Sequence, residues 1–421
     1  MRLGVIADDM TGATDVALML TKSGMRVVQT IGAPGPDWAA PAADAVVIAL
    51  KSRTIDPADA VSQSLAACRA LTAGGASQIL FKYCSTFDST AKGNIGPVAD
   101  ALADALNAPL ALVCPAFPEA GRTIFQGHLF VGADPLDESP MKDHPLTPMR
   151  DSSLVRLMAA QTQRKVGLIP FATVAKGADA VSAACAALIA EGCRYAVADA
   201  VTNDNLLTLG AAAAAHRLVT GGSGIALGLP ANFPDTSARG DVRRFEAPSG
   251  RAAVLAGSCS TATRAQVAAA QAAGAPNRAI DVGALARGDL TAADLADWAL
   301  SQSSHAAPLI YSTADPASVA DAQKALGVGR AGELVEQTIA DTAALLIEGG
   351  VRRLIVAGGE TSGAVIQRLG VRALEIGPEI APGVPWTKVI DGPPIAVALK
   401  SGNFGGPDFF ARALVMLDAR S

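Results

Sequence analysis

Residues 356–370, VAGGETSGAVIQRLG, combine the end of an apolar run, a glycine turn and a helical pattern. The run is β-branched enough for a buried strand, whereas apolar residues return at helical spacing from Ala364 to Leu369, and Gly370 stands where a helix should end. A strand, a glycine turn and a helix N-terminus leave several backbone N–H groups free beside the positive end of the helix dipole, which favours a phosphate. A tight turn with a capped helix explains the same residues, and this stretch alone leaves both interpretations open.

The composition is that of a large globular protein. A chain of 421 residues with half of its residues apolar and 17% charged can form two or three domains with large cores. The net charge of −5 provides no basic field for a nucleic-acid backbone. Apolar segments are interrupted before the ~20 residues that a membrane span needs, and no export signal is recognised. Six cysteines without a C-x-x-C pair are typical of buried free thiols in a reducing compartment. We therefore expect a cytoplasmic protein that binds neither nucleic acid nor membrane.

Short apolar runs alternate with helical patterns along the chain, which is typical of βαβ units and mainly parallel sheets. In the first half we expect strands at residues 3–7, 45–50, 79–83, 110–114, 166–171, 195–201 and 225–229. Helices are expected there at residues 178–191 and 205–219, with a hairpin at 123–131 inside an irregular segment, 121–150. In the second half we expect strands at 252–257, 309–312, 354–357 and 395–399, and helices at 261–273, 333–347 and 409–417.

A linker divides this pattern. Residues 230–250 contain prolines, glycines and charges without an apolar period, and the alternation of strands and helices restarts after them. The simplest architecture is two α/β domains with mainly parallel sheets and an active site in the cleft between them. We place a first domain at residues 1–235, the linker at 236–250 and a second domain at 251–421.

Polar side chains gather behind three predicted strands of the first domain. The segment IADDMTGATD puts Asp8 and Asp9 at a strand end, where two carboxylates could accept hydroxyl hydrogens, hold Mg²⁺ or act as a general base. A capping aspartate with an exposed neighbour is the alternative. The segment KYCSTFDSTAKGN, residues 82–94, packs hydroxyls, an acid and a base together, which suits a small polyhydroxylated anion. Arg53 follows another strand and could pair with a carboxylate, although a solvated arginine is the default.

Three turns of the second half resemble one another: GSCST at residues 257–261, GGETSG at 358–363 and SGNFGG at 401–406. Each follows an apolar strand and precedes a helix, so together they could converge on one polyphosphate. Residues 327–332 match G-x-G-x-x-G, but residues 320–326 before them are predicted to be helix, which argues against a dinucleotide fingerprint. The histidines show no metal-ligand spacing. His128 and His144 fall in the irregular segment and could touch a substrate, although loop histidines are more often structural.

Several of these stretches together resemble the four-carbon acid sugar kinase family. They are IADDMTGATD, STFDSTAKGN, the glycine turn before SGAVIQRLG, GPEIAPGVPW and LKSGNFGGPDFF, and the similarity extends along essentially the whole chain. Segments 115–131 and 143–149 look most like the members that phosphorylate a 3-oxo sugar acid. The resemblance implies transfer of phosphate from ATP, with Mg²⁺, to the terminal hydroxyl of a four-carbon acid sugar, most closely 3-oxo-tetronate. A kinase for threonate or erythronate is the alternative within the family.

The resemblance also implies that the first domain binds the sugar acid and the second binds ATP. Asp9 and Asp88 are expected to be catalytic, with Asp9 favoured as the base. The sugar acid is expected to contact Asp8, Thr11, Arg53, Ser89, Thr90, Lys92 and Asn94. ATP is expected to contact Ser258, Gly359, Glu360, Thr361, Ser362, Gly363, Gly402 and Asn403. No metal ligands are assigned, and the oligomeric state, a homo-oligomer included, is left open.

Two other classes of protein remain as alternatives. A non-catalytic sugar-acid binding protein would keep the acidic first domain but would not need a second, phosphate-binding domain. A nicotinamide-dependent dehydrogenase would also be α/β, but it should carry a correctly placed dinucleotide fingerprint.

Overall fold

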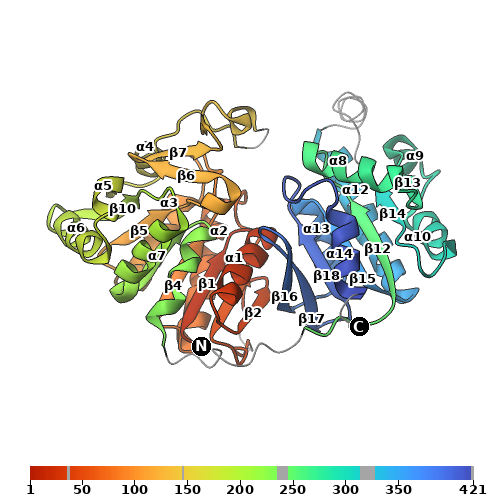
Figure 1. Ribbon diagram of the computed structural model, residues 1–421, viewed down its shortest axis with the longest axis horizontal. Helices are drawn as coiled ribbons and strands as arrows, with labels where there is room; N and C mark the ends of the chain where they lie inside the picture. Colours follow the sequence, from red (N-terminus) through yellow and green to blue (C-terminus); the bar gives the residue numbers. More distant parts are fainter. Residues whose placement is uncertain (36–37, 145–146, 235–244, 313–327, 419–421) are drawn as a thin grey trace. The chain divides into compact units, whose positions relative to one another are not determined.

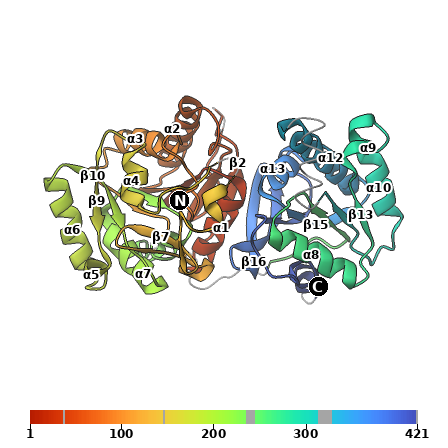
Figure 2. The same cartoon turned by 90° about the horizontal axis from the view of Figure 1, so that it is seen from above.

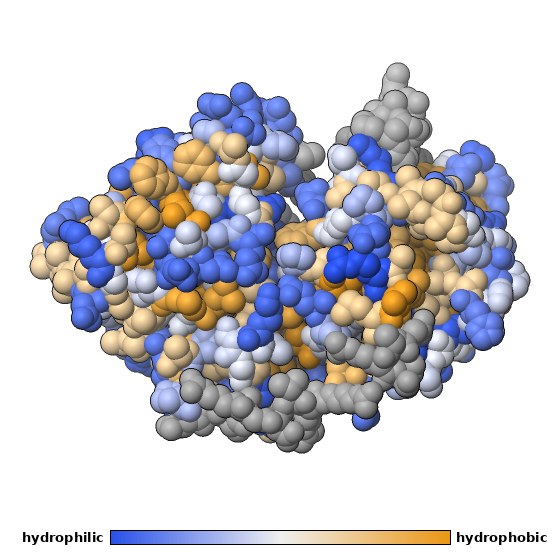
Figure 3. Space-filling model, in the orientation of Figure 1, coloured by the Kyte–Doolittle hydropathy of each residue, from blue (hydrophilic) through white to orange (hydrophobic). Residues whose placement is uncertain are grey.

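The computed structural model describes residues 1–35, 38–144, 147–234, 245–312 and 328–418 (Figure 1). The chain forms two compact units, Met1–Val242 and Arg243–Ser421, and both are α/β, so the predicted fold class is confirmed. The linker predicted at 236–250 includes residues 236–244, which lie outside the described residues, as does the helix predicted at 320–326. Within the described ranges, no helix is long and apolar enough to cross a membrane. On the face shown in Figure 3, hydrophilic and hydrophobic residues are intermixed over each unit.

The main sheet of the first unit is parallel throughout its described strands, in the order β2-β3-β1-β4-β11-β5-β10-β9. The strands are β1 (Leu3–Ala7), β2 (Val27–Ile31), β3 (Ala45–Ala49), β4 (Gln78–Lys82), β5 (Ala111–Cys114), β9 (Lys165–Ile169), β10 (Cys193–Ala198) and β11 (Leu218–Gly221). Ala7 pairs with Ala49 on one side and with Lys82 on the other. The chain therefore leaves β3, β1 and β4 at neighbouring points of one sheet edge.

Helices cover both faces of this sheet (Figure 2). On one face lie α1 (Met10–Lys22), α6 (Ala178–Ala190) and α7 (Asn203–Ala212), and on the other lie α2 (Pro57–Ala73), α3 (Ile95–Ala105) and α4 (Leu154–Ala159). A short helix, α5 (Phe171–Val174), follows β9. The helix after β1 thus takes one face, while the helices after β3 and β4 take the other. In sheets of this kind, ligands bind outside the carboxyl ends of the strands where the chain changes face.

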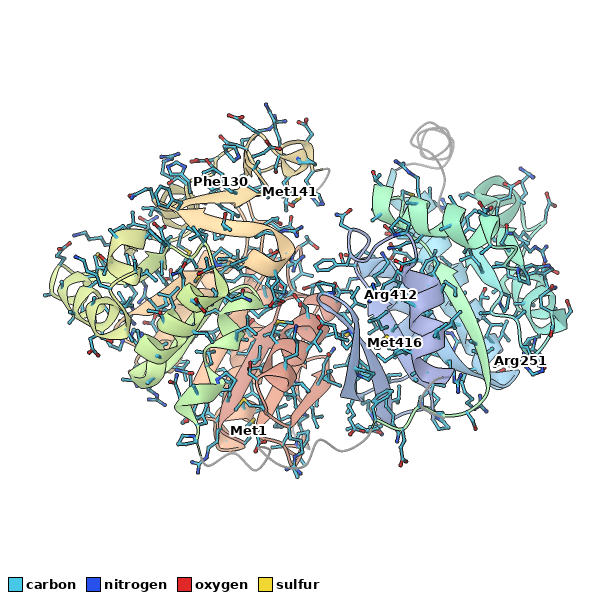
Figure 4. All side chains as sticks on the ribbon, in the orientation of Figure 1. Met1, Phe130, Met141, Arg251, Arg412 and Met416 are labelled. Atoms are coloured by element: carbon cyan, nitrogen blue, oxygen red, sulfur yellow. The ribbon has the colours of Figure 1, made fainter. Side chains whose placement is uncertain are left out.

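Between β5 and α4 the chain forms a small antiparallel sheet, here called the excursion, residues 117–144. It contains β6 (Arg122–Phe125), β7 (His128–Val131), β8 (Asp134–Pro135) and the 3-10 helices η1 (Pro118–Ala120) and η2 (Pro140–Asp143). The predicted hairpin is confirmed, and Figure 4 labels Phe130 and Met141 on this segment. Buried Asp199, just after β10, accepts the backbone N–H groups of Gln126 and Gly127 at 2.7 and 2.8 Å. This carboxylate anchors the excursion to the main sheet.

The sequence analysis was wrong at the end of the first unit. The strand predicted at 225–229 is absent, because Gly224–Leu227 form a 3-10 helix, η4, followed by a second, η5 (Pro230–Asn232). The last strand of this region is instead β11 (Leu218–Gly221), which begins where the helix predicted at 205–219 should end, and α7 stops before the 3-10 helix η3 (Ala213–Ala215). A Cβ on Gly221 would lie 2.2 Å from the carbonyl oxygen of Cys114, so β11 approaches β5 too closely for a side chain. In an apolar run this short, hydrophobic periodicity does not distinguish a strand from a helical segment.

The sheet of the second unit has the order β13-β14-β12-β15-β18-β17-β16. The strands are β12 (Arg251–Ala256), β13 (Asn277–Ala279), β14 (Leu309–Tyr311), β15 (Val351–Ala357), β16 (Ala373–Ala381), β17 (Val384–Asp391) and β18 (Ala396–Lys400). The neighbouring strands β13, β14, β12, β15 and β18 are parallel to one another. β17 pairs antiparallel with both β18 and β16, and its hairpin with β16 was not predicted from the sequence. Ala357 pairs with Ala256 and with Lys400, so β12, β15 and β18 end side by side.

Helices also cover both faces of the second sheet (Figure 2). On one face lie α8 (Thr261–Ala272) and α14 (Phe409–Asp418), and on the other lie α10 (Ala292–Ser301), α12 (Val328–Glu348) and α13 (Gly359–Arg368), with α9 (Val282–Arg287) beside α12. The fully buried Trp386 of β17 donates its indole N–H to the carbonyl oxygen of Ala413 at 2.9 Å, which fastens α14 to the sheet. Because the helices after β12 and β15 take opposite faces, the ends of these strands are again a favoured place for a ligand.

Candidate functional site

In the first unit, Arg53 lies among three carboxylates. Its Nε and Nη2 atoms donate to Asp8 at 2.8 Å each, Nη2 also donates to Asp9 at 2.8 Å, and Nη1 donates to Asp88 at 3.2 Å. The Nζ atom of buried Lys82 lies 3.6 Å from Asp9. These five residues are called the acid cluster. With all of them ionised, three acids and two cations give the cluster a net charge of −1.

The acid cluster lies where three neighbouring strands of the sheet end. Asp8 and Asp9 follow β1, Arg53 follows β3, and Lys82 ends β4. The buried side-chain amide of Asn94 donates to the carbonyl oxygens of Ser52 and Ile55 at 2.8 and 2.9 Å. Asn94 therefore holds the loop that carries Arg53, a structural task that the sequence analysis did not assign to it.

The two adjacent aspartates have opposite electrostatic environments. Burial raises the pKa of Asp8, and the attraction of Arg53 offsets only part of that rise. Burial acts in the same direction on Asp9, but Arg53, Lys82 and local hydrogen bonds outweigh it and lower the pKa of this group. Asp9 also caps α1, since its carboxylate accepts from the hydroxyl of Thr11 at 2.8 Å and from the N–H of Gly12 at 3.2 Å. These contacts speak against the predicted role of Asp9 as a base, because so many donors make a carboxylate a weak proton acceptor.

Asp88 occupies a different position in the acid cluster. Phe87 and Asp88 both have left-handed backbone conformations, with φ of 61° and 51°, which are uncommon for residues other than glycine and cluster at functional sites. One carboxylate oxygen of Asp88 faces Arg53, and the other accepts the hydroxyl of Thr147. Nδ1 of His144 lies 2.9 Å from that hydroxyl and accepts the N–H of Thr147 at 3.2 Å. His144, the last residue of the excursion, and Thr147 just after it thus contact Asp88 of the acid cluster, which the sequence pattern did not predict.

Some of the remaining residues of segment 82–94 hold its loop in place, whereas others are exposed to solvent. The amide of Gln161 donates to the hydroxyl of Ser89 at 2.9 Å and to the carbonyl oxygen of Thr90 at 2.7 Å, so Ser89 stabilises the loop. Lys92 is exposed. A pocket of about 10 Å³ beside the cluster has room for about one water molecule. It is lined by Asp8, Ser52, Arg53, Phe81, Asp88, Ser89, Asn94, Ile95 and Val98.

In the second unit, the three glycine turns follow β12, β15 and β18, which are consecutive strands of the sheet, so the turns lie at one sheet edge. The N–H of Gly257 donates to Ala357 at 3.0 Å, and the N–H of Gly358 donates to the carbonyl oxygen of Lys400 at 2.8 Å. A Cβ at Gly257 or Gly358 would lie 2.3 or 2.7 Å from the hydroxyl oxygen of Thr361. The glycines therefore let the turns pack closely, and Thr361 fills the space between two of them.

The start of α13 has the features of an anion site. Gly358, with φ of 135°, precedes the helix without a side-chain cap, and a Cβ at Gly359 or Gly363 would meet nothing within 4 Å. The hydroxyl of Ser362 is fully buried and has no hydrogen-bond partner in the described part of the chain. Glu360, in the same turn, is exposed. A helix N-terminus, the open space over its glycines and the unpartnered hydroxyl of Ser362 together suit an anionic ligand.

The turn after β18 is fixed to the start of α8. The carbonyl oxygen of Gly402 accepts from the hydroxyls of Ser260 and Thr263 at 2.6 and 2.9 Å, and a Cβ on Gly402 would lie 2.3 Å from the hydroxyl oxygen of Ser258. The amide of Gln266 donates to the carbonyl oxygens of residues 404, 405 and 406 at 3.0 to 3.1 Å. Asn403 is exposed. Sequence reasoning named Ser258 and Gly402 for this site but not Ser260, Thr263 and Gln266, whose side chains hold the turn.

No metal centre is built into the described ranges. No group of three or more His, Cys, Asp and Glu side chains in them could hold a metal ion. The sequence offered Asp8 and Asp9 as possible Mg²⁺ ligands. Both oxygens of Asp8 accept from Arg53, while one oxygen of Asp9 accepts from Arg53 and the other from Thr11. Of the six cysteines, which were expected to be buried, Cys259 is exposed and Cys84 is half-buried, while the other four are buried.

Two family models match the chain, one in each unit. The model described as a sugar-binding N-terminal domain matches residues 3–229, and the model described as a nucleotide-binding C-terminal domain matches residues 253–410. The acid cluster lies in the first match, and the three glycine turns lie in the second.

Curated proteins and solved structures match nearly the whole chain. The 3-oxo-tetronate kinase of Cupriavidus necator is 56% identical, over 99% of this chain and 97% of its own, and that of Burkholderia multivorans is 57% identical over the same shares. A crystal structure of a Salmonella typhimurium LT2 protein, provisionally named a tRNA synthase, is 47% identical with a TM-score of 0.87 and 98% of each chain covered. A crystal structure of a Haemophilus influenzae protein is 46% identical with a TM-score of 0.80, covering 98% of this chain and all of the other.

Proposed function

The chain belongs to the four-carbon acid sugar kinase family, and from that premise we propose that it transfers the γ-phosphate of ATP to the terminal hydroxyl of 3-oxo-tetronate, giving 3-oxo-tetronate 4-phosphate and ADP. The observation that carries this proposal is the 56% identity over 99% of the chain to the 3-oxo-tetronate kinase of Cupriavidus necator. The free cysteines favour a reducing, cytoplasmic setting.

The acid cluster is the proposed sugar-acid site. Because the cluster has a net negative charge, the hydroxyls of the substrate suit its carboxylates better than the substrate's own carboxylate does. Arg53 is the cluster residue that suits the substrate carboxylate. Its bond to Asp88, at 3.2 Å, is the longest of its four hydrogen bonds to the acids. The proposal is that the substrate carboxylate replaces this bond. The pair between Arg53 and the substrate would then free an oxygen of Asp88.

Asp88 is the proposed proton acceptor. In phosphoryl transfer, the terminal hydroxyl oxygen forms a bond to the γ-phosphorus while the bond from that phosphorus to the β-phosphate oxygen breaks, and the hydroxyl proton must go to a base. Released from Arg53, the carboxylate of Asp88 can take this proton. Asp9 keeps its donors from Thr11, Gly12 and Lys82, so it stays a cap and an ion partner.

The three glycine turns are the proposed ATP site. The positive end of the α13 dipole and the unpartnered hydroxyl of Ser362 suit phosphate oxygens, and the open space over Gly359 and Gly363 gives the phosphates room. Ser258 is held against Gly402, on the neighbouring turn. Mg²⁺, an ion that kinase sites commonly hold through substrate phosphates, water and one or two carboxylates, would neutralise charge on the phosphates.

The test is a coupled assay of ADP release with a panel of 3-oxo-tetronates, threonate and erythronate. The proposal predicts turnover that depends on both Mg²⁺ and a sugar acid, with the highest kcat/KM for a 3-oxo-tetronate. Higher kcat/KM for threonate or erythronate would move the assignment to the neighbouring substrate class. Binding of sugar acids without any ADP release would instead identify a non-catalytic binding protein.

A further inference from the structure

Lys400 is a buried cation among neutral oxygens. It ends β18, and its side chain is fully buried. The Nζ atom donates to the hydroxyl of Thr263 at 3.0 Å and to the carbonyl oxygens of Ser401 and Gly402 at 2.9 Å each. Three acceptors use all three N–H bonds of an ammonium group, so the geometry fits the charged form.

Among the described residues, no carboxylate forms an ion pair with Lys400. The nearest ring, that of Phe409, has its centroid 6.0 Å from Nζ. The charged residues on the surrounding elements are Arg264 on α8, Glu360 on α13, Asp408 and Arg412 at α14, and Arg353 and Lys388, which lie opposite Ala396 at the far end of β18. Burial lowers the pKa of Lys400 to about 7. A buried cation without a counter-charge is costly, and that cost is relieved when an anion binds nearby.

The hydrogen bonds of Lys400 also determine the shape of the edge that faces the proposed ligand. They join the last residues of β18 to Thr263 in the first turn of α8. The same carbonyl oxygen of Gly402 accepts from Ser260 and Thr263, so one ammonium group and two hydroxyls hold this peptide in place. With the carbonyl groups directed toward Lys400, the conformation of the glycine turn that carries Asn403 is fixed before a ligand arrives.

We propose that Lys400 is a positioning residue of the nucleotide site, which fixes the turn after β18 against α8 and whose unbalanced charge is neutralised when nucleotide phosphates bind. This inference rests on the proposed function, because it takes the three glycine turns as the ATP site. This role differs from a purely structural one because bound phosphates must raise the pKa of Lys400. At a pH where Lys400 is partly neutral in the free protein, nucleotide binding is therefore accompanied by proton uptake.

The direction of the pH effect follows from this linkage. Well below pH 7, Lys400 is charged with or without nucleotide, so its protonation does not affect affinity. As the pH rises above about 7, the free protein loses the proton while the complex keeps it, so affinity falls. An arginine at this position stays charged throughout and removes the dependence.

The test is isothermal titration of the full-length protein with Mg²⁺-ADP between pH 7 and 8.5, in buffers of different ionisation enthalpy. The variants are Lys400→Met, which removes the charge and the donors, and Lys400→Arg, which keeps the charge; Lys176→Met makes the same change at an exposed lysine of the first unit. We expect wild type and Lys176→Met to take up protons and to lose about threefold or more in affinity across this range. Lys400→Arg should show neither effect, and Lys400→Met should bind about tenfold or more weakly at pH 7 with the KM for the sugar acid unchanged.

The results of this titration distinguish the role of Lys400 from the assignment of the ATP site. If wild type binds Mg²⁺-ADP without proton uptake, or if folded Lys400→Met binds it within about twofold of wild type, the role of Lys400 is refuted while the ATP site stands. If wild type does not bind the nucleotide at all, the proposed function itself fails. Should Lys400→Met not fold, the comparison of wild type with Lys400→Arg still decides the question.

Discussion

Arg53 and Asp8 form a two-bond ion pair, with Nε to Oδ2 and Nη2 to Oδ1 both at 2.8 Å. This arrangement locks the guanidinium plane, so the two remaining contacts, to Asp9 and Asp88, have fixed directions. A lysine cannot reproduce it, because an ammonium group is a point charge without a planar fork. The pair therefore determines where the other acids of the cluster lie.

Removing Arg53 should make stability strongly dependent on pH. In Arg53→Ala, three close carboxylates lose their shared cation, so their pKa values in the folded state should rise above the wild-type values. A folded-state pKa that is raised costs stability above the unfolded pKa, and that cost fades as the pH falls through the folded value. We expect the Tm deficit of Arg53→Ala relative to wild type to be largest near pH 7 and to shrink toward pH 5. Thermal unfolding across this range checks it, and a deficit that is constant with pH would show that the charges are not responsible.

The two candidate bases should separate kinetically. Asp88→Asn keeps the shape of the side chain but removes the proton acceptor, so kcat should fall by about a hundredfold or more. Asp9→Asn keeps a residue that caps helices well, and it should lower Tm and change kcat much less. Steady-state kinetics of both variants at saturating ATP test this assignment. The sequence-based preference for Asp9 would be restored if the larger loss in kcat belonged to Asp9→Asn.

The strand ends of the first unit could be predicted from sequence, whereas the contacts that support them could not. Asp8, Arg53 and Asp88 follow apolar runs, and parallel strands bring their carboxyl ends to one edge, so their meeting followed from local pattern. Gln161 acts on Ser89 across 72 positions, and Thr147 acts on Asp88 across 59. Neither contact carries a local signal, because both depend on chain segments that are far apart in the sequence.

In the second unit, the missed residue was inside a quoted motif. Lys400 is the lysine of the segment LKSGNFGGPDFF. From the sequence, a lysine at a strand end is expected to face solvent, and only the three-dimensional packing shows that it is fully buried. The error at 225–229 has a related cause: an apolar run was taken for a strand, and the close approach of Gly221 to Cys114 that identifies β11 is visible only in three dimensions.

A methyl group at Gly363 should act on the ligand rather than on the fold. A Cβ there meets nothing within 4 Å, so Gly363→Ala should leave the free protein at least as stable as wild type. If ATP phosphates occupy that space, the KM for ATP should rise about tenfold while the KM for the sugar acid stays unchanged. Gly332→Ala on α12, where a Cβ also meets nothing within 4 Å, is the matched control and should leave both constants unchanged. Equal ATP constants in the two variants would place the phosphates elsewhere.

Cys259 should report on nucleotide binding. It is exposed between Ser258 and Ser260 in the first glycine turn, whereas burial raises the pKa of Cys114 to about 12 and that of Cys185 to about 11. Because thiolates are the reactive form, mild alkylation at pH 8 should modify Cys259 first, and Mg²⁺-ATP should slow the reaction. Peptide mass spectrometry with and without nucleotide measures this, with Cys259→Ser as the control for site identity. Modification of Cys259 at the same rate with saturating nucleotide would place the ligand away from this turn.

The central claim is that the chain phosphorylates the terminal hydroxyl of a 3-oxo-tetronate, and the most direct measurement is identification of the product. The protein, Mg²⁺-ATP and a 3-oxo-tetronate are incubated together, and phosphorus–proton correlation NMR locates the new phosphate. Our account predicts one equivalent of ADP for each equivalent of a monoester whose phosphorus couples to the C4 methylene protons. A phosphate on the C2 oxygen, an acyl phosphate on the carboxylate, or ADP formed with free phosphate and unchanged sugar acid would contradict it.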